Sequence, residues 1–238
     1  MYRLYKKNVL NFSLAWIIAY VVLLSATDSL SVSLGFEKII TAPVSMVFAL
    51  LMFGFIKKHN LSEQYGLCSF MGSLKNYLYF IPLGLMISVN LWNGVTMNVS
   101  VLETVIFILS MLCVGFIEEV IFRGFLLKAM CKDNIRLAIF VSSIIFGLGH
   151  IVNLLNGREL LPTLLQICYA TAIGFLFTIF FYKGKSLLPC IITHSIFNSI
   201  AIFAVQRTQM FSIITSILLC VISLGYALWI LKRAEKSA

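Results

Sequence analysis

The sequence predicts an all-α protein, a single polytopic transmembrane bundle of about eight helices that uses the whole chain, residues 1–238. The chain is 61% hydrophobic, well above the roughly 45–50% apolar usage of soluble domains, and its mean hydropathy is +1.00. Its apolar segments have the length of about 20 residues that crosses a bilayer as a helix. Its basic residues gather in every second connection between those segments, as the positive-inside rule describes.

Charges and turn residues separate the apolar segments, and each segment predicts one spanning helix. The first follows a basic start and resembles a signal sequence, but Leu24 stands where cleavage needs a small residue, so we expect an uncleaved span. The third is short, and the fourth projects beyond the hydrocarbon at its Lys128 end. In order, the expected spans are residues 9–27, 39–56, 77–92, 101–130, 137–155, 161–182, 187–204 and 211–231.

The placement of lysine and arginine predicts the orientation. A net charge of +9 would suggest nucleic acid in a soluble protein, but 15 of the 18 basic residues fall on one side of the expected bundle. That side is expected to be cytoplasmic, with both termini there, and we expect a multi-pass cell-membrane protein with no nucleic-acid partner. The cytoplasmic set is Arg3, Lys6, Lys7, Lys57, Lys58, Lys75, Arg123, Lys128, Lys132, Arg136, Lys183, Lys185, Lys232, Arg233 and Lys236, against Lys38, Arg158 and Arg207 outside.

Two adjacent acids lie in the middle of the fourth span. Glu118 and Glu119 are followed by Arg123, and a carboxylate at bilayer depth costs several kcal/mol unless it is paired or protonated. Glu119 and Arg123 are four residues apart and can form an ion pair, whereas Glu118 is rotated by about 100° and points elsewhere. The pair is either a structural clamp or takes a direct part in chemistry, and the pattern as a whole favours a functional site.

Two later spans carry the other conspicuous polar groups, His150 and the pair His194 and Asn198. With a helical rise of about 1.5 Å per residue, Glu118 and His150 lie roughly 21 Å from the cytoplasmic charges and Asn198 roughly 20 Å. An isolated intramembrane histidine can be a helix-bridging hydrogen-bond donor, but here three helices present polar groups at one depth. The third histidine, His59, lies in a loop and is expected to be solvated.

This set of groups suits peptide-bond hydrolysis without a covalent intermediate. A carboxylate beside an imidazole can take a proton from water, and a second imidazole with a carboxamide can donate hydrogen bonds to an oxyanion. The hypothesis requires Glu118 to lie within about 10 Å of His150 or His194. Ser195, next to His194, is the alternative nucleophile. The six cysteines show no CxxC pair, which indicates small buried hydrophobic residues rather than disulfides or a thiolate zinc site.

Three short motifs resemble those of one protein family. Residues 118–123, 146–150 and 194–198 read EExxxR, FxxxH and HxxxN, in the order found in the CPBP (CAAX protease and bacteriocin-processing, or Abi) intramembrane proteases. The resemblance covers residues 101–204, the expected catalytic core. It implies a site reached from the cytoplasm and similarity to the prenyl-protein endopeptidases that remove the last three residues of a CAAX protein.

The resemblance also implies a role for each motif residue. Glu118 and His150 would activate water, and His194 and Asn198 would form the oxyanion site. The implied catalytic residues are therefore Glu118, His150, His194 and Asn198, with Glu119 and Arg123 as supporting residues.

Metal dependence and substrate are left open by the motifs. The family is often labelled as metalloproteases, and two histidines with a glutamate can ligate zinc, but there is no HExxH motif, which favours a metal-free mechanism without a required cofactor. The expected partners are the lipid bilayer and a membrane-associated peptide or protein, namely a prenylated tail, a signalling peptide or a bacteriocin leader. The competing hypothesis is a non-proteolytic multi-pass protein, either an immunity or scaffold protein or a proton-coupled transporter, although the chain shows no inverted repeat.

Overall fold

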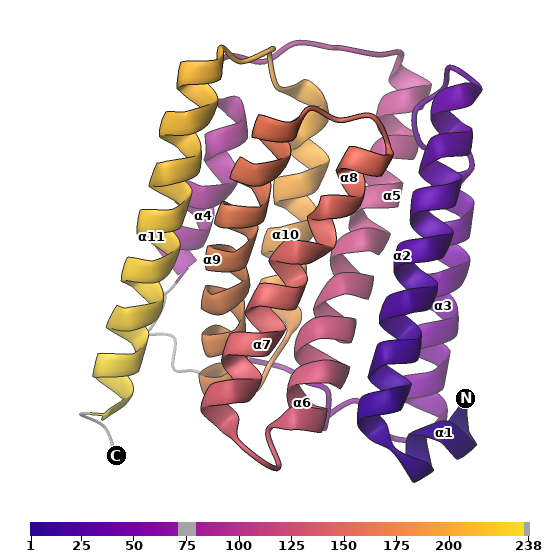
Figure 1. Cartoon of the computed structure of the whole chain (residues 1–238), viewed down its shortest axis with the longest axis vertical. Helices are drawn as coiled ribbons and strands as arrows, with labels where there is room; N and C mark the ends of the chain where they lie inside the picture. Colours follow the sequence, from indigo (N-terminus) through magenta and orange to yellow (C-terminus); the bar gives the residue numbers. More distant parts are fainter. Residues whose placement is uncertain (71–79, 236–238) are drawn as a thin grey trace.

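The computed structural model describes residues 1–70 and 80–235 as a bundle whose main helices run side by side along one long axis (Figure 1). Side chains are described for residues 1–70 and 80–232. The expectations for Lys75, Lys236 and the first residues of the expected span 77–92 lie outside the described residues, as does the side chain of Arg233.

Six helical stretches of the described chain are long and apolar enough to cross a membrane. They are Val9–Ser33, Thr41–Lys58, Val101–Met130, Ile135–Leu155, Leu160–Gly184 and Gln209–Lys232. Two shorter apolar helices, Ile81–Leu91 and Leu188–Phe203, correspond to the third and seventh expected spans. The predicted fold class, a helical polytopic bundle, is confirmed, and the expected number of eight spans becomes six long helices with two shorter ones.

Several of these stretches consist of more than one helical segment. The segments are α1 (Tyr2–Lys7), α2 (Val9–Ser33), α3 (Thr41–Lys58), α4 (Ile81–Ser88), α5 (Val101–Glu119), the π-helix η3 (Val120–Leu126), α6 (Leu127–Met130), α7 (Ile135–Leu148), the short 3₁₀ turn η4 (Gly149–Ile151), α8 (Val152–Leu155), α9 (Leu160–Gly184), α10 (Leu188–Ile200) and α11 (Gln209–Glu235).

Polar side chains fix where three of the helices begin. Asn8 and Asn134 accept hydrogen bonds from backbone N–H groups in the first turns of α2 and α7. At α5, Ser100 and Glu103 form a reciprocal capping box, which satisfies two N–H groups that have no partner within the helix. Glu103, one of the few charges in its span, is therefore explained by helix capping.

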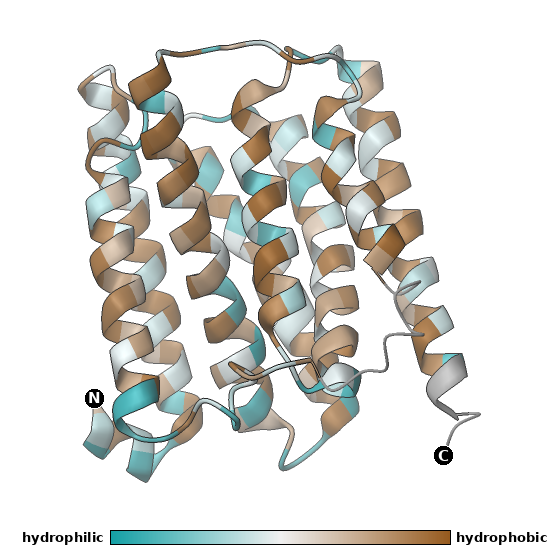
Figure 2. Cartoon of the chain, turned by 180° about the vertical axis from the view of Figure 1, so that it is seen from behind, coloured by the Kyte–Doolittle hydropathy of each residue, from teal (hydrophilic) through white to brown (hydrophobic). Residues whose placement is uncertain are grey.

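The outer surface of the bundle is apolar over most of its length. Figure 2 shows brown, hydrophobic residues along the helices and more teal, hydrophilic ones near the two ends. Large side chains such as Ile18, Leu51, Phe140 and Ile217 are exposed. An apolar surface of this extent is costly in water and suits lipid. The protein is therefore a multi-pass membrane protein.

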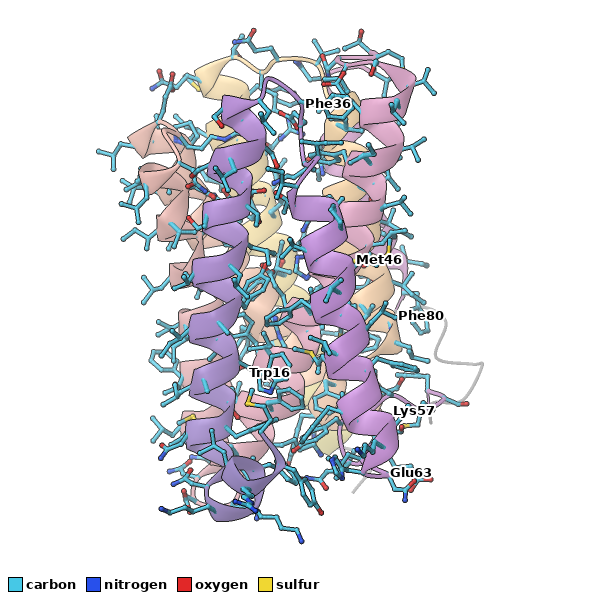
Figure 3. The ribbon with its side chains drawn as sticks, turned by 90° about the vertical axis from the view of Figure 1, so that its right-hand side faces the viewer. Trp16, Phe36, Met46, Lys57, Glu63 and Phe80 are labelled. Atoms are coloured by element: carbon cyan, nitrogen blue, oxygen red, sulfur yellow. The ribbon has the colours of Figure 1, made fainter. Side chains whose placement is uncertain are left out.

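Packing places the later helices around a common interior. α5 packs against α3 and α10, and α9 packs against α7 and α11. The N-terminus and the end of α11 lie at the same end of the bundle, together with the α6–α7 connection (Figure 1). Figure 3 shows Lys57 and Glu63 near that end of the α2–α3 pair and Phe36 at the opposite end.

The π-helix η3 was not predicted. It follows Glu119 directly, contains Arg123 and separates α5 from α6 within one continuous stretch. Wider turns of this kind are rare and are frequently found at functional sites. All seven of its residues are buried, so the change of helix type lies inside the bundle, beside the two acids.

Candidate active site

The predicted ion pair lies at the junction of α5 and η3. Arg123 Nη1 donates to Glu119 Oε1 at 3.1 Å, and both side chains are fully buried. The guanidinium also lies over the ring of Phe146, 4.0 Å from its centroid. Opposite charges in a low-dielectric interior need such partners, because an isolated charge there is very costly. The expected i,i+4 pairing is confirmed, and Phe146 packs against it.

His194, which α10 supplies, lies between the two acids. Its Nδ1 donates to Glu119 Oε1 at 2.8 Å, and its Nε2 lies 3.5 Å from Glu118 Oε2. Because Arg123 pairs with Glu119, the Glu119 carboxylate is the acceptor, and the proton on His194 is assigned to Nδ1. The requirement that Glu118 lie within reach of a histidine is met by His194.

Glu118 has a second partner from outside the three motifs. The hydroxyl of Tyr20, on α2, donates to Glu118 Oε1. Glu118 Oε2 is buried and has no hydrogen-bond partner in the described part of the chain. Sequence analysis missed Tyr20, because the two residues are 98 positions apart and nothing in their spacing relates them.

His150 lies in the turn η4 and is held by a chain of two amides. Gln166 Nε2 lies 3.3 Å from His150 Nδ1, and Gln166 Oε1 accepts from Asn153 Nδ2 at 2.9 Å. With the amide oxygen directed to Asn153, the Gln166 NH₂ group donates to Nδ1, which assigns the ring proton of neutral His150 to Nε2. Gln166 and Asn153 were also missed, although an amide in an apolar helix is a recognisable sign of interhelical hydrogen bonding.

A cavity lies between α4, α7, α9 and α10 and contains about 440 Å³ of empty space, part of it open to the outside. His150, His194 and Asn198 all line it. Glu118 lies next to these residues, with its Oε2 3.5 Å from His194 Nε2. The other lining residues are mostly apolar: Met86, Phe146, Gln166, Tyr169, Ala170, Ile173, Phe177, Thr193 and Phe197. The structure thus brings together the four residues that the motifs suggested for catalysis.

Ser195, the alternative nucleophile, points to a different neighbour. Its hydroxyl donates to the Leu112 carbonyl on α5 at 3.3 Å, and its backbone packs closely against Gly115. It does not line the cavity. This position suits a role in helix packing.

The side chains present do not fit the zinc alternative. Within residues 1–70 and 80–232, whose side chains are described, no three His, Cys, Asp or Glu side chains lie close enough together to hold one metal ion. Glu118 and His194 are neighbours, but His150 has its Nδ1 directed to Gln166. We therefore derive no catalytic step through a metal, and the absence of a required cofactor stays a prediction. All six cysteines are free, but the expectation that they are buried is correct only for Cys190, since Cys168 is exposed and the other four are half-buried.

The comparisons with known proteins agree with the motifs. Residues 100–200 match the family model described as type II CAAX prenyl endopeptidase Rce1-like. This part of the chain, less than half of its 238 residues, is similar to the Rce1-like family and is called the Rce1-like segment below. The match includes all three motifs and confirms the resemblance to the CPBP proteases. An Rce1-like segment supports protease activity for this chain, since the family is one of CAAX proteases. The comparison with curated proteins gave no match, and the comparison with solved structures gave none either.

The Rce1-like segment does not contain the whole site. It extends from the cap of α5 to the end of α10. Tyr20 on α2 and Met86 on α4 lie before it in the chain, yet one donates to Glu118 and the other lines the cavity. The N-terminal helices therefore complete the surroundings of the Rce1-like residues.

Proposed function

We propose that the protein is an intramembrane CAAX-type endopeptidase that hydrolyses a peptide bond with water activated by Glu118. One observation carries the proposal: the buried Glu118 Oε2 has no hydrogen-bond partner among the described residues and lies 3.5 Å from Nε2 of His194, a residue that lines the cavity. Such a carboxylate oxygen is free to accept a proton from water. The Rce1-like match of residues 100–200 supports the same reaction class.

The proposed reaction begins with Glu118 as general base. The carboxylate takes a proton from water while the oxygen of that water attacks the scissile carbonyl carbon and forms a tetrahedral intermediate. His150, whose Nε2–H is not used by Gln166, helps to orient the water. Asn198 donates a hydrogen bond to the oxyanion, and so does His194 when a second proton occupies its Nε2. Glu118 then gives its proton to the leaving amine as the C–N bond breaks.

The supporting residues act through His194. Glu119 accepts the Nδ1–H of the imidazole, and Arg123 holds Glu119 in place from the next turn. This arrangement directs Nε2 toward Glu118 and stabilises a positive charge on the ring. Glu119 is thus proposed as a positioning residue, which combines the two interpretations that the sequence left open, clamp and participant.

The proposed substrate is an apolar, membrane-associated tail. Aromatic and aliphatic residues form most of the cavity wall, which suits an apolar peptide or a lipid-modified one. The family description suggests a prenylated CAAX protein, with a signalling or bacteriocin leader peptide as the other candidate. We place the termini in the cytoplasm of a cell-membrane protein, on the positive-inside argument.

The test uses purified protein in liposomes and a farnesylated CAAX peptide with a fluorophore and a quencher on either side of the bond after the prenylated cysteine. Wild-type protein should release the three-residue product. Glu118→Gln should lower kcat by about 10³-fold or more, because it removes the general base. Glu103→Gln is the matched control: it is the same change on the same helix, and glutamine can still complete a capping box.

Other outcomes would reject the proposal. Unchanged cleavage by Glu118→Gln would exclude the glutamate mechanism. No cleavage of the prenylated peptide, combined with cleavage of an unprenylated leader peptide, would change the substrate class. Proton-gradient-dependent uptake that is lost in Glu118→Gln, with no peptide cleaved, would establish a transporter instead.

A further inference from the structure

Tyr20 connects the first membrane helix to the catalytic acid. It lies in the middle of α2, is 9% exposed, and precedes the Rce1-like segment by 80 positions. Its hydroxyl donates to Glu118 Oε1. Among the described residues, Tyr20 is the hydrogen-bond donor to the Glu118 carboxylate, because Oε2 accepts no hydrogen bond there.

The surroundings of Tyr20 hold the ring in one place. Its ring centroid lies 6.3 Å from that of Phe48 on α3, and α2 packs against both α3 and the π-helix η3. A buried hydroxyl without a partner is unfavourable in an apolar environment. The presence of tyrosine rather than phenylalanine at this position is therefore explained by Glu118.

The two acids are held by different groups. Glu119 is bound by Arg123 and His194 through Oε1. Among the described residues, Glu118 accepts from the Tyr20 hydroxyl through Oε1, and its Oε2 lies 3.5 Å from His194 Nε2. Without Tyr20, the carboxylate could rotate and exchange its two oxygens, because nothing else fixes Oε1.

We propose that Tyr20 is a positioning residue for catalysis: its hydroxyl occupies Glu118 Oε1, so that Oε2 alone faces His194 and the nucleophilic water. This inference rests on the proposed function. It gives α2, which lies outside the Rce1-like segment, a role in the reaction. Neither the motifs nor the family match includes that helix. Because Tyr20 does not line the cavity, its effect should appear in turnover and not in substrate binding.

Tyr20→Phe tests the role with the loss of a single oxygen atom. We expect kcat for the farnesylated CAAX peptide to fall by about 10- to 100-fold, since small misplacement of a catalytic group has effects of this size. KM should stay within about twofold, because no contact with substrate is lost. Tyr65→Phe is the matched control: Tyr65 is fully buried, packs against Phe125 and does not touch the site. It should keep the kcat of the wild type.

A double-mutant cycle separates positioning from a general loss of folded protein. Glu118→Asp shortens the acid so that it no longer reaches the phenol hydroxyl. Tyr20→Phe added to Glu118→Asp should then lower the residual kcat by less than about twofold, because the coupling is already lost. A full 10- to 100-fold further loss would show that Tyr20 acts elsewhere and would overturn the proposal.

The failure of this inference can be told apart from failure of the proposed function. If Glu118→Gln is inactive and Tyr20→Phe turns over like the wild type, Tyr20 has no positioning role but the glutamate mechanism stands. A rise in KM without a change in kcat would likewise overturn positioning, as would an equal loss in Tyr65→Phe. If Glu118→Gln is fully active, both proposals fall together.

Discussion

The two histidines of the site are held in opposite tautomers by different neighbours. Glu119 accepts from Nδ1 of His194, whereas Gln166 donates to Nδ1 of His150. In its neutral form, His194 therefore offers a bare Nε2, and His150 offers Nε2–H. The hydrogen-bonding neighbours of each ring determine whether it can accept or donate a proton at the cavity.

Gln166→Met tests this assignment at His150. Methionine has a similar length but donates no hydrogen bond, so the imidazole loses the group that orients Nδ1. We expect kcat to fall by about 10- to 100-fold, the effect of a misplaced catalytic group, with unchanged protein level in the membrane. Gln206→Met, the same change at an exposed position, is the control. Cleavage that is equal in both variants would contradict the role given to Gln166.

At the scale of residues, sequence spacing predicted only the contacts that lie within one helix or one motif. Glu119 and Arg123 are four positions apart, and their ion pair follows from helix geometry. The Tyr20–Glu118 hydrogen bond joins positions 98 apart. Such a contact depends on how α2 packs against the rest of the bundle, which no local pattern records.

At the scale of elements, the close contact of α5 with α10 places His194 beside the acids. A Cβ atom added to Gly115 would lie 2.8 Å from the backbone N of Ser195 and 2.9 Å from its Cα. Real side chains are not found so close, so the two helices can approach this far only because residue 115 is glycine. His194 directly precedes Ser195, so its position relative to Glu118 depends on the close approach of Gly115 to Ser195.

Gly115→Ala should therefore displace α10 from α5. We expect the free energy of unfolding to fall by about 1–3 kcal/mol, the usual cost of overpacking. The fall should be seen as a lower midpoint of thermal unfolding in detergent, and kcat should also decrease. Gly124→Ala is the matched control in the same stretch, because a Cβ there would lie 3.7 Å from its nearest neighbours, Leu187 and Tyr65. Equal unfolding midpoints for the two variants would show that the α5–α10 distance is not set by Gly115.

Helix existence was easier to predict than helix detail. Hydrophobic length identified each apolar segment, but no local pattern in the sequence predicted the π-helix η3 or the turn η4 at His150. The helices α4 and α10 lie in segments that were expected as spans, the first of which was already short in the sequence. Both are apolar, and in the described chain they are shorter than the six long helices.

At the scale of the whole molecule, the arrangement of the connections agrees with the predicted distribution of charge. The N-terminus, the α6–α7 connection and the end of α11 share one end of the bundle, and the α8–α9 connection lies at the other (Figure 1). Lys132 lies in the α6–α7 connection, whereas Arg158 lies in the α8–α9 connection at the opposite end. By the positive-inside rule, we expect the end with Lys132 to face the cytoplasm.

Single cysteines placed in these two connections give the orientation directly. Lys132→Cys and Arg158→Cys, each in a variant whose six native cysteines are replaced and which still cleaves the peptide, expose their thiols at opposite ends because both positions are exposed. A membrane-impermeant maleimide added to intact cells should label Arg158→Cys at once and Lys132→Cys only after the membrane is opened, since the charged reagent does not cross the bilayer. The reverse pattern would place the termini outside and would require the substrate to reach the site from that side.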